Sequence, residues 1–192
     1  MNQSATTQRL LKLYDNAPER TRLAGRSWYT EAAGVVADIS ESTALTPAQV
    51  CGAFSALSPR VHYVRNVRLT RTLCRMWHDV QDLGVDLLPR AEDTARALGC
   101  MSSPMREAYA ALKSEHTPRG PKTGAFYRAI LGDDSALVLD VWALRACGLE
   151  RLPRVGERRT ITASYRSAAA RRGETVRDFQ AIVWCAIRGR VN

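Results

Sequence analysis

Helix-initiation signals recur along the whole chain, and they limit its fold more than any other feature of the sequence. Residues 46–49 read Thr-Pro-Ala-Gln, a capping box with proline at the first helical position, and Ser103-Pro104 repeats the order of cap and proline. Thr175 caps a last helix, and Gly99 marks the end of an earlier one. The polar–apolar alternation of a strand is nearly absent. The sequence therefore predicts an all-α fold.

The apolar periodicity predicts ten helices, separated by short connections without low-complexity linkers or repeats. They lie near 5–14, 27–39, 47–57, 61–79, 90–98, 104–115, 122–131, 138–147, 159–171 and 175–188. The loops at 80–89 and 149–158 are the predicted breaks. A chain of 192 residues is long enough for one sizeable domain or two small lobes that share an interface.

The chain is basic, with a formal net charge of +9. A basic balance of this size favours a polyanion partner, because each neutralised phosphate releases condensed counterions; the alternative is a basic protein without such a partner. No apolar run reaches transmembrane length and no signal peptide opens the chain, so we expect a cytoplasmic protein with no membrane contact.

The five cysteines are spaced too widely for a Cys-x-x-Cys pair, and their odd number argues against a disulfide framework. We therefore expect no metal, no iron–sulfur cluster and no cofactor. Cys74 and Cys185 fall in apolar helical runs, which predicts buried thiols.

Two segments carry the residues best suited to chemistry. Residues 120–132 are a Gly-Pro break followed by a short apolar helix that opens with Lys122, and the apolar run 137–139 ends in Asp140. Folded onto one site, the lysine can act as a nucleophile and the aspartate as its electrostatic partner. The structural alternatives are a surface lysine at a helix start and an aspartate that only caps the next helix.

These segments resemble the core of the helix-hairpin-helix DNA glycosylase superfamily over roughly residues 45–148. That family carries a glycine-bounded hairpin, a Lys-Thr at the start of the next helix, and an aspartate eighteen residues after the lysine, the spacing of Lys122 and Asp140 here. A weaker similarity covers residues 54–60, where Arg60 takes the position of a residue that probes the DNA stack. Pro118 replaces the first hairpin glycine, and Trp142 replaces the histidine that follows the aspartate.

The resemblance implies a monomer with two helical lobes, a helix-hairpin-helix motif and a cleft between the lobes. One lobe would cover about 47–131, with the hairpin at 116–131. The other would combine about 1–46 with 132–192. The implied partner is double-stranded DNA.

The implied activity is a DNA glycosylase with AP-lyase activity on a modified or damaged base. A neutral Lys122 amine would attack C1′ of the sugar and form a Schiff base, which allows β-elimination, while Asp140 stabilises the developing positive charge. Because a base inside a duplex is out of reach, the nucleotide must be flipped into a pocket, for which Tyr127 and Trp142 are the candidates.

The resemblance also implies DNA contacts outside that pocket, made by Arg60, His62, Arg119, Gly120, Thr123 and Arg145. Arg60 and His62 would fill or probe the vacated stack, and the turn at Gly120 would hold a phosphate through backbone N–H groups. Four arginines recur at three- and four-residue spacing and share one helix face: Arg65, Arg68, Arg71 and Arg75. That face is either solvated or a stripe along the DNA backbone.

Two further functions stay open on the sequence alone. A base-hypermodification enzyme of the same fold would act on altered pyrimidines in DNA without breaking the sugar bond. A non-catalytic helix-hairpin-helix protein would bind duplex DNA and leave it unchanged. Whichever of the three functions holds, we expect the protein in the cytoplasm of a bacterium or a virus-infected cell, associated with the nucleoid.

Overall fold

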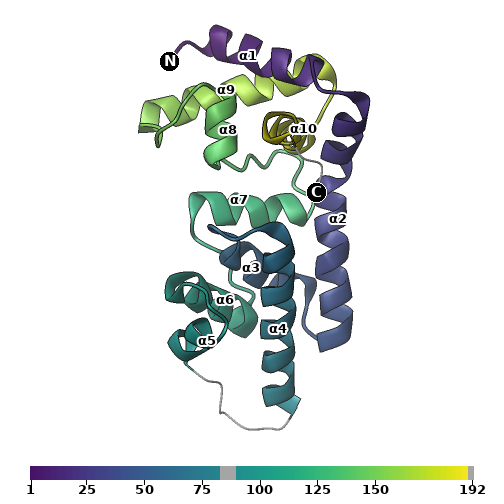
Figure 1. Cartoon of the computed structure of the whole chain (residues 1–192), viewed down its shortest axis with the longest axis vertical. Coiled ribbons are helices and arrows are strands. Elements are labelled where there is room, and N and C mark those ends of the chain that lie inside the picture. The colour runs from purple at the N-terminus through teal and green to yellow at the C-terminus, as the bar shows by residue number, and fades with distance from the viewer. Residues whose placement is uncertain (83–89, 190–192) are drawn as a thin grey trace. The chain divides into compact units, whose positions relative to one another are not determined.

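The computed structural model describes residues 1–82 and 90–189, which contain ten α-helices and no strand (Figure 1). The all-α prediction is confirmed. The helices are α1 (Gln3–Asp15), α2 (Glu19–Thr43), α3 (Pro47–Leu57), α4 (Tyr63–Asp82), α5 (Ala91–Ala97), α6 (Ser102–Ser114), α7 (Pro121–Ile130), α8 (Val141–Ala146), α9 (Val155–Arg172) and α10 (Val176–Arg188).

The capping signals explain where the helices begin. The capping box before α3 is formed in full, since Thr46 Oγ1 accepts from the Gln49 N–H at 3.2 Å and Gln49 Oε1 accepts from the Thr46 N–H at 2.9 Å. The predicted span 47–57 therefore matches α3. Thr175 Oγ1 likewise accepts from the N–H of Asp178, at 3.0 Å, ahead of α10.

Several predicted helices differ from the observed ones at their ends; α9, for example, begins at Val155, inside the predicted break at 149–158. α2 extends well beyond the predicted 27–39 at both ends, and its first turn is held by the Pro18 carbonyl, which accepts from the N–H groups of Thr21 and Arg22. The helix predicted over 138–147 begins only at Val141, because Asp140 is extended and caps it. The predicted loop at 80–89 lies largely outside the described residues.

The chain divides into two compact units. The first unit comprises Met1–Glu31 and Gly132–Asn192, and the second comprises Ala32–Leu131. The predicted hairpin motif, the two lobes and the cleft between them stay predictions.

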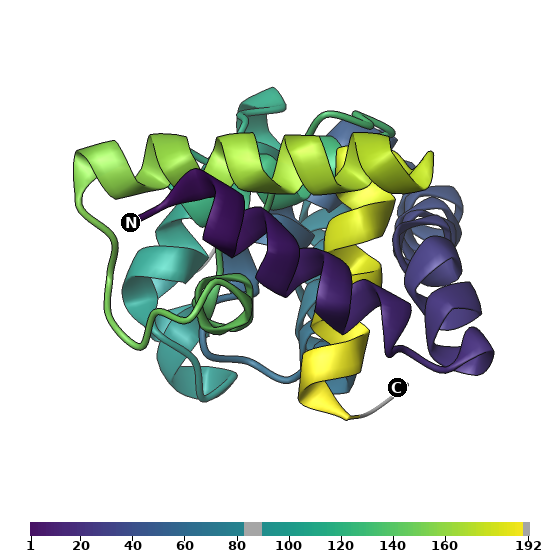
Figure 2. The same cartoon turned by 90° about the horizontal axis from the view of Figure 1, so that it is seen from above.

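The core of the first unit forms where α1, α8, α9 and α10 pack together, with α1 and α9 side by side (Figure 2). Aromatic rings fill its centre: Tyr14 stacks on Phe179 at 5.2 Å, and Tyr165 meets Phe179 edge-on at 6.2 Å. Gly25 permits close approach to α10, since a Cβ there would lie 2.5 Å from the Ile182 Cα.

The second unit is built around α3, which packs against α4, α6 and α7 and is buried from Val50 to Leu57. Gly52 brings α3 close to α6, because a Cβ at that position would lie 2.6 Å from the Ala111 Cβ. Gln49 Nε2 also donates to the carbonyl of Leu112 on α6, at 2.5 Å. In the C-terminal part of α4, the Trp77 ring packs edge-on against the Tyr109 ring, with 5.6 Å between the ring centres.

The cysteines are all free thiols. Cys74 and Cys185 are buried, as predicted, and burial raises the pKa of Cys74 to about 12 and that of Cys185 to about 11. Within the described residues, no helix combines the length and the apolar character needed to cross a membrane.

Candidate functional site

Lys122 is the second residue of α7, in the second unit, and it is half-buried. α7 begins here because Gly120 adopts the extended N-cap conformation and Pro121 supplies a φ angle that already suits the first turn. The Gly120 carbonyl accepts from the Gly124 N–H at 2.7 Å and from Thr123 Oγ1 at 3.3 Å. These two hydrogen bonds fix the turn that carries the lysine.

The chain before Lys122 folds tightly against the first turn of α7. A Cβ on Gly124 would lie 2.7 Å from the Pro118 carbonyl oxygen, so only glycine fits the observed backbone there. Thr123 is buried and closes the turn, whereas Arg119 is exposed. The predicted phosphate-contacting residues thus occupy one short turn with an exposed guanidinium beside it.

Tyr127 lies one turn further along α7 and is half-buried. Burial raises the pKa of its hydroxyl, and a side-chain hydrogen bond with Thr117 acts in the opposite direction. The Tyr127 carbonyl accepts a weak hydrogen bond from Cys51 Sγ at 3.6 Å. Tyr127 therefore links the loop before α7, the helix itself and α3.

Arg60 and His62 are exposed in the turn between α3 and α4. Arg60 has a φ angle of +60°, a left-handed conformation that is uncommon for a residue with a Cβ. The N–H of Val61 reaches back to the Ser58 carbonyl at 3.4 Å, which closes the turn. A strained exposed arginine at a predicted stack-probing position supports a functional reason for the strain.

Asp140 lies in the first unit and is the N-cap of α8. Its Oδ1 accepts from the N–H groups of Trp142 and Ala143, at 3.0 and 2.8 Å, and its Oδ2 accepts from Trp184 Nε1 at 3.2 Å. All three partners are donors, which suits an ionised carboxylate. The side chain is only half-buried and keeps acceptor capacity for a further partner.

Side chains from two other elements hold α8 in place. The buried Tyr165 hydroxyl donates to the Ala143 carbonyl at 3.2 Å, and Arg9 Nε donates to the Ala146 carbonyl at 3.0 Å. These contacts bind both ends of a six-residue helix that would be unstable alone. The Asp140 carboxylate is therefore presented from a fixed support.

Trp142 and Arg145 lie one turn apart on α8. The Arg145 guanidinium stacks 4.8 Å from the centre of the Trp142 ring, and Arg145 is exposed whereas Trp142 is half-buried. A cation held on an aromatic face loses little conformational freedom when it meets an anion.

Trp184 is a site residue that the sequence analysis missed. Its position in the apolar stripe of α10 is typical of core packing, yet it is half-buried and donates its indole N–H to Asp140. Its ring lies 5.8 Å from that of Trp28, and the Arg188 guanidinium lies 4.7 Å above it. The available signal was the indole N–H itself, which needs an acceptor when it is withdrawn from water.

The family model described as "Family of unknown function (DUF7178)" matches residues 1–191. The chain belongs to this family. No curated protein and no solved structure matches the chain. The description of DUF7178 names no activity, so the function of this member is argued from its own residues.

In this DUF7178 member the predicted site residues fall into two groups. The second unit holds Lys122 with the turn before it, Tyr127, and the exposed pair Arg60 and His62. The first unit holds Asp140 with Trp142, Arg145 and the added Trp184. The pairing of Lys122 with Asp140 stays a prediction.

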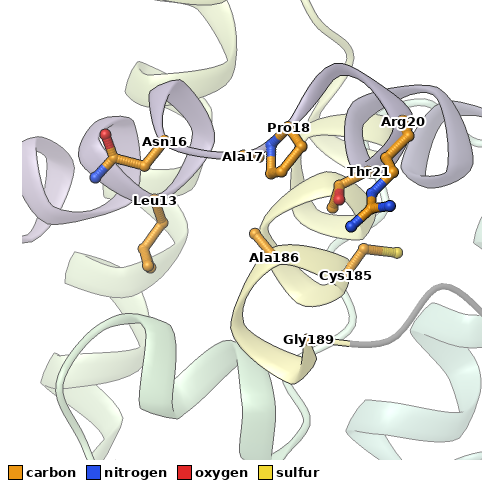
Figure 3. A pocket seen from close by; sticks show the side chains of 9 residues that line it. All are labelled: Leu13, Asn16, Ala17, Pro18, Arg20, Thr21, Cys185, Ala186 and Gly189. Carbon is orange, nitrogen blue, oxygen red and sulfur yellow. The ribbon is translucent and has the colours of Figure 1, made fainter.

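The first unit also contains a hollow of about 650 Å³ that none of the predicted site residues lines (Figure 3). Its lining is Leu13, Asn16, Ala17, Pro18, Arg20, Thr21, Cys185, Ala186 and Gly189. Among the described residues, no group of three or more His, Cys, Asp or Glu could hold a metal ion.

Proposed function

We propose that this protein is a DNA glycosylase with β-lyase activity. The observation that carries the proposal is the arrangement of two helix starts: Lys122 at the second position of α7, and Asp140 at the N-cap of α8, eighteen residues later. This order is similar to that of the helix-hairpin-helix glycosylases, in which the lysine is the nucleophile and the aspartate its electrostatic partner.

The choice of lysine at position 122 gives independent support. The chain has 3 lysines and 25 arginines. Lys12 and Lys113 are exposed, whereas Lys122 is half-buried. An arginine stays protonated in proteins and cannot form a Schiff base, whereas a lysine amine can lose its proton. In a chain whose basic residues are mostly arginine, a half-buried lysine is suited to act as a Schiff-base nucleophile.

The proposed reaction follows from this chemistry. The neutral Lys122 amine bonds to C1′ while the glycosidic bond breaks and the base leaves with a proton. The sugar ring opens to give an iminium ion, loses a proton from C2′ and expels the 3′ phosphate. The ionised Asp140 stabilises the positive charge on the sugar and assists the proton transfers.

The other predicted residues supply binding. Tyr127 and Trp142 contact the flipped base, and Arg60 and His62 occupy the space that it leaves. Arg145, already stacked on Trp142, and Arg119, exposed beside the Gly120 turn, neutralise phosphates. None of these contacts selects one base, so the substrate is a class of altered bases in duplex DNA.

Borohydride trapping tests the proposal. The protein is mixed with duplexes carrying uracil, 5-hydroxymethyluracil, oxidised pyrimidines, 8-oxoguanine or an abasic site, and the reductant is then added. We expect a covalent adduct that Lys122→Gln abolishes. Lys113→Gln, which removes an exposed lysine of α6, is the matched control and should trap as well as the parent.

The other outcomes separate the alternatives. An adduct that survives in Lys122→Gln makes the nucleophile assignment wrong. No adduct on any duplex, together with an altered base in intact DNA, identifies a base-modifying enzyme. No adduct and no altered base, with salt-dependent binding that Lys122→Gln and Asp140→Asn leave intact, identifies a DNA-binding module.

A further inference from the structure

One face of α4 carries three exposed arginines, Arg68, Arg71 and Arg75. At 100° per residue they fall within about 60° of one another around the helix axis, opposite the buried face that includes Leu69, Leu73 and Trp77. Residues 60–75 contain five arginines and no aspartate or glutamate. The exposed Asp79 follows one turn after Arg75 on the same face, but within the described residues it forms no ion pair with these arginines. We call Arg68, Arg71 and Arg75 the α4 stripe.

Some arginines of the described residues have a carboxylate partner, and the members of the α4 stripe differ from them in this respect. Within residues 1–82 and 90–189, none of its members forms an ion pair. Paired arginines occur in both units: Arg22, Arg26, Arg151, Arg172 and Arg177 in the first, and Arg96 and Arg106 in the second. Arg65, the fourth arginine grouped here by its spacing, points aside and donates to the Gly99 carbonyl at 2.6 Å.

Like charges three and four residues apart on a helix repel each other and cost a few tenths of a kcal/mol per pair. An exposed surface gains nothing from that repulsion unless an anion relieves it. We infer that the α4 stripe binds the phosphate backbone of duplex DNA, as a second contact surface apart from the turn at Gly120. For its choice of partner this inference rests on the proposed function.

The dimensions of the α4 stripe fit such a contact. Seven residues separate its first and last members, which is about 10.5 Å along the helix axis at 1.5 Å per residue. One DNA strand presents a phosphate about every 3.4 Å along its duplex axis, so the stripe spans about three phosphates. Guanidinium groups bind phosphate through two parallel N–H donors, and the contact reads no sequence.

The test is the salt dependence of binding to an undamaged duplex. The slope of log K, where K is the binding constant for DNA, against log salt is negative. The triple variant Arg68→Gln/Arg71→Gln/Arg75→Gln should reduce the magnitude of this slope by about 3, one for each lost phosphate contact. The matched control is Arg158→Gln/Arg159→Gln/Arg166→Gln on α9, which removes the same charge from exposed residues of the first unit. The control should change the slope much less.

A variant that keeps the positive charges shows whether a changed slope comes from the lost charges or from misfolding. Arg68→Lys/Arg71→Lys/Arg75→Lys should keep the parent slope, and circular dichroism should show parent-like melting for all three variants, because the side chains are exposed. Equal slope changes in the α4 and α9 glutamine variants would reduce the effect to net charge and overturn the inference. A parent-like slope in the α4 glutamine variant would also overturn it.

Two comparisons complete the experiment. The parent protein is also tested on phosphatidylserine vesicles. If it binds them as tightly as DNA, and the α4 glutamine variant does not bind them, the α4 stripe is a general anion-binding surface and the DNA assignment is contradicted. Trapping is measured separately. If no adduct forms but the α4 glutamine variant changes the salt slope, the proposed chemistry is wrong and this inference stands. If the adduct forms but the α4 glutamine variant keeps the parent slope, this inference is wrong and the proposed chemistry stands.

Discussion

Asp140 has two separate hydrogen-bonding roles, and they belong to different oxygens. Oδ1 caps α8 through two backbone N–H groups, and Oδ2 accepts the Trp184 indole N–H. Capping and the proposed chemistry are therefore compatible in one side chain, because both need its oxygens held in a fixed position. The two roles can be separated experimentally, because only Oδ2 contacts Trp184.

We predict that Asp140→Asn and Trp184→Phe are coupled in stability. Asparagine keeps an oxygen for the cap but turns its NH2 group toward the indole N–H, which leaves two donors facing each other. Asp140→Asn should cost about 1–2 kcal/mol in the parent and less than about 0.5 kcal/mol in Trp184→Phe. Urea unfolding of the four proteins measures the difference, and strictly additive costs would contradict the predicted contact.

Arg60 gives a second prediction at the scale of single residues. Its left-handed conformation costs about 1–2 kcal/mol, and glycine relieves it at the expense of about 0.5–1 kcal/mol of unfolded-chain entropy. Arg60→Gly should therefore raise the stability by about 0.5–1 kcal/mol while it weakens DNA binding. Thermal unfolding and duplex binding are the two measurements.

Ala44 provides the control for Arg60. It has a φ angle of +52°, is exposed and lies outside the predicted site. Ala44→Gly should give a similar gain in stability and leave DNA binding unchanged. If both glycine variants weaken binding equally, Arg60 has no specific part in the DNA contact.

At the scale of elements, the first turn of α7 depends on one glycine. Replacing a helical glycine by alanine normally stabilises a helix by up to about 1 kcal/mol. At Gly124, however, the added Cβ would lie 2.7 Å from the Pro118 carbonyl oxygen, which is backbone and has little room to move. We predict that Gly124→Ala destabilises the protein by about 1–3 kcal/mol, as measured by calorimetry.

The matched variant for this prediction is Gly34→Ala. Gly34 lies within α2, and no atom lies within 4 Å of the position that its Cβ would take. Gly34→Ala should stabilise the protein by about 0.5–1 kcal/mol. The prediction fails if the two alanine variants change the melting temperature in the same direction.

The elements were predictable where capping is local. Thr46 and Thr175 fix the starts of α3 and α10 through residues three positions away, which sequence spacing can detect. The length of α2 was not predictable in this way, because it depends on tertiary contacts such as the close approach of Gly25 to Ile182. Trp184 was missed for a similar reason, since its partner Asp140 lies 44 residues away.

For the whole molecule, acid should act through carboxylates that are hydrogen-bonded to arginine. A hydrogen bond from Arg151 lowers the pKa of Glu157 to about 2, and one from Arg172 lowers that of Asp15. Burial alone would raise the pKa of Glu174, but hydrogen bonds from Arg26 and Tyr14 outweigh it and the pKa is lowered. These three carboxylates belong to the first unit, and in the second unit a hydrogen bond from Arg106 lowers the pKa of Glu92.

The direction of the pH effect follows from these shifts. A group with a lowered folded-state pKa contributes its full stability above its unfolded pKa, about 4.5 for glutamate, and loses it as the pH falls through the folded value. The melting temperature should therefore fall from about pH 4.5 toward pH 2. Glu157→Gln should show a shallower fall, and parallel curves for the variant and the parent would contradict the predicted contribution of Glu157.

The tryptophans are unevenly divided between the units: Trp28, Trp142 and Trp184 belong to the first, and Trp77, packed against Tyr109, to the second. In Trp77→Phe all tryptophan emission comes from the first unit, and a variant that keeps only Trp77 reports on the second. Intrinsic fluorescence can thus follow each unit separately during unfolding or DNA binding, without an attached dye.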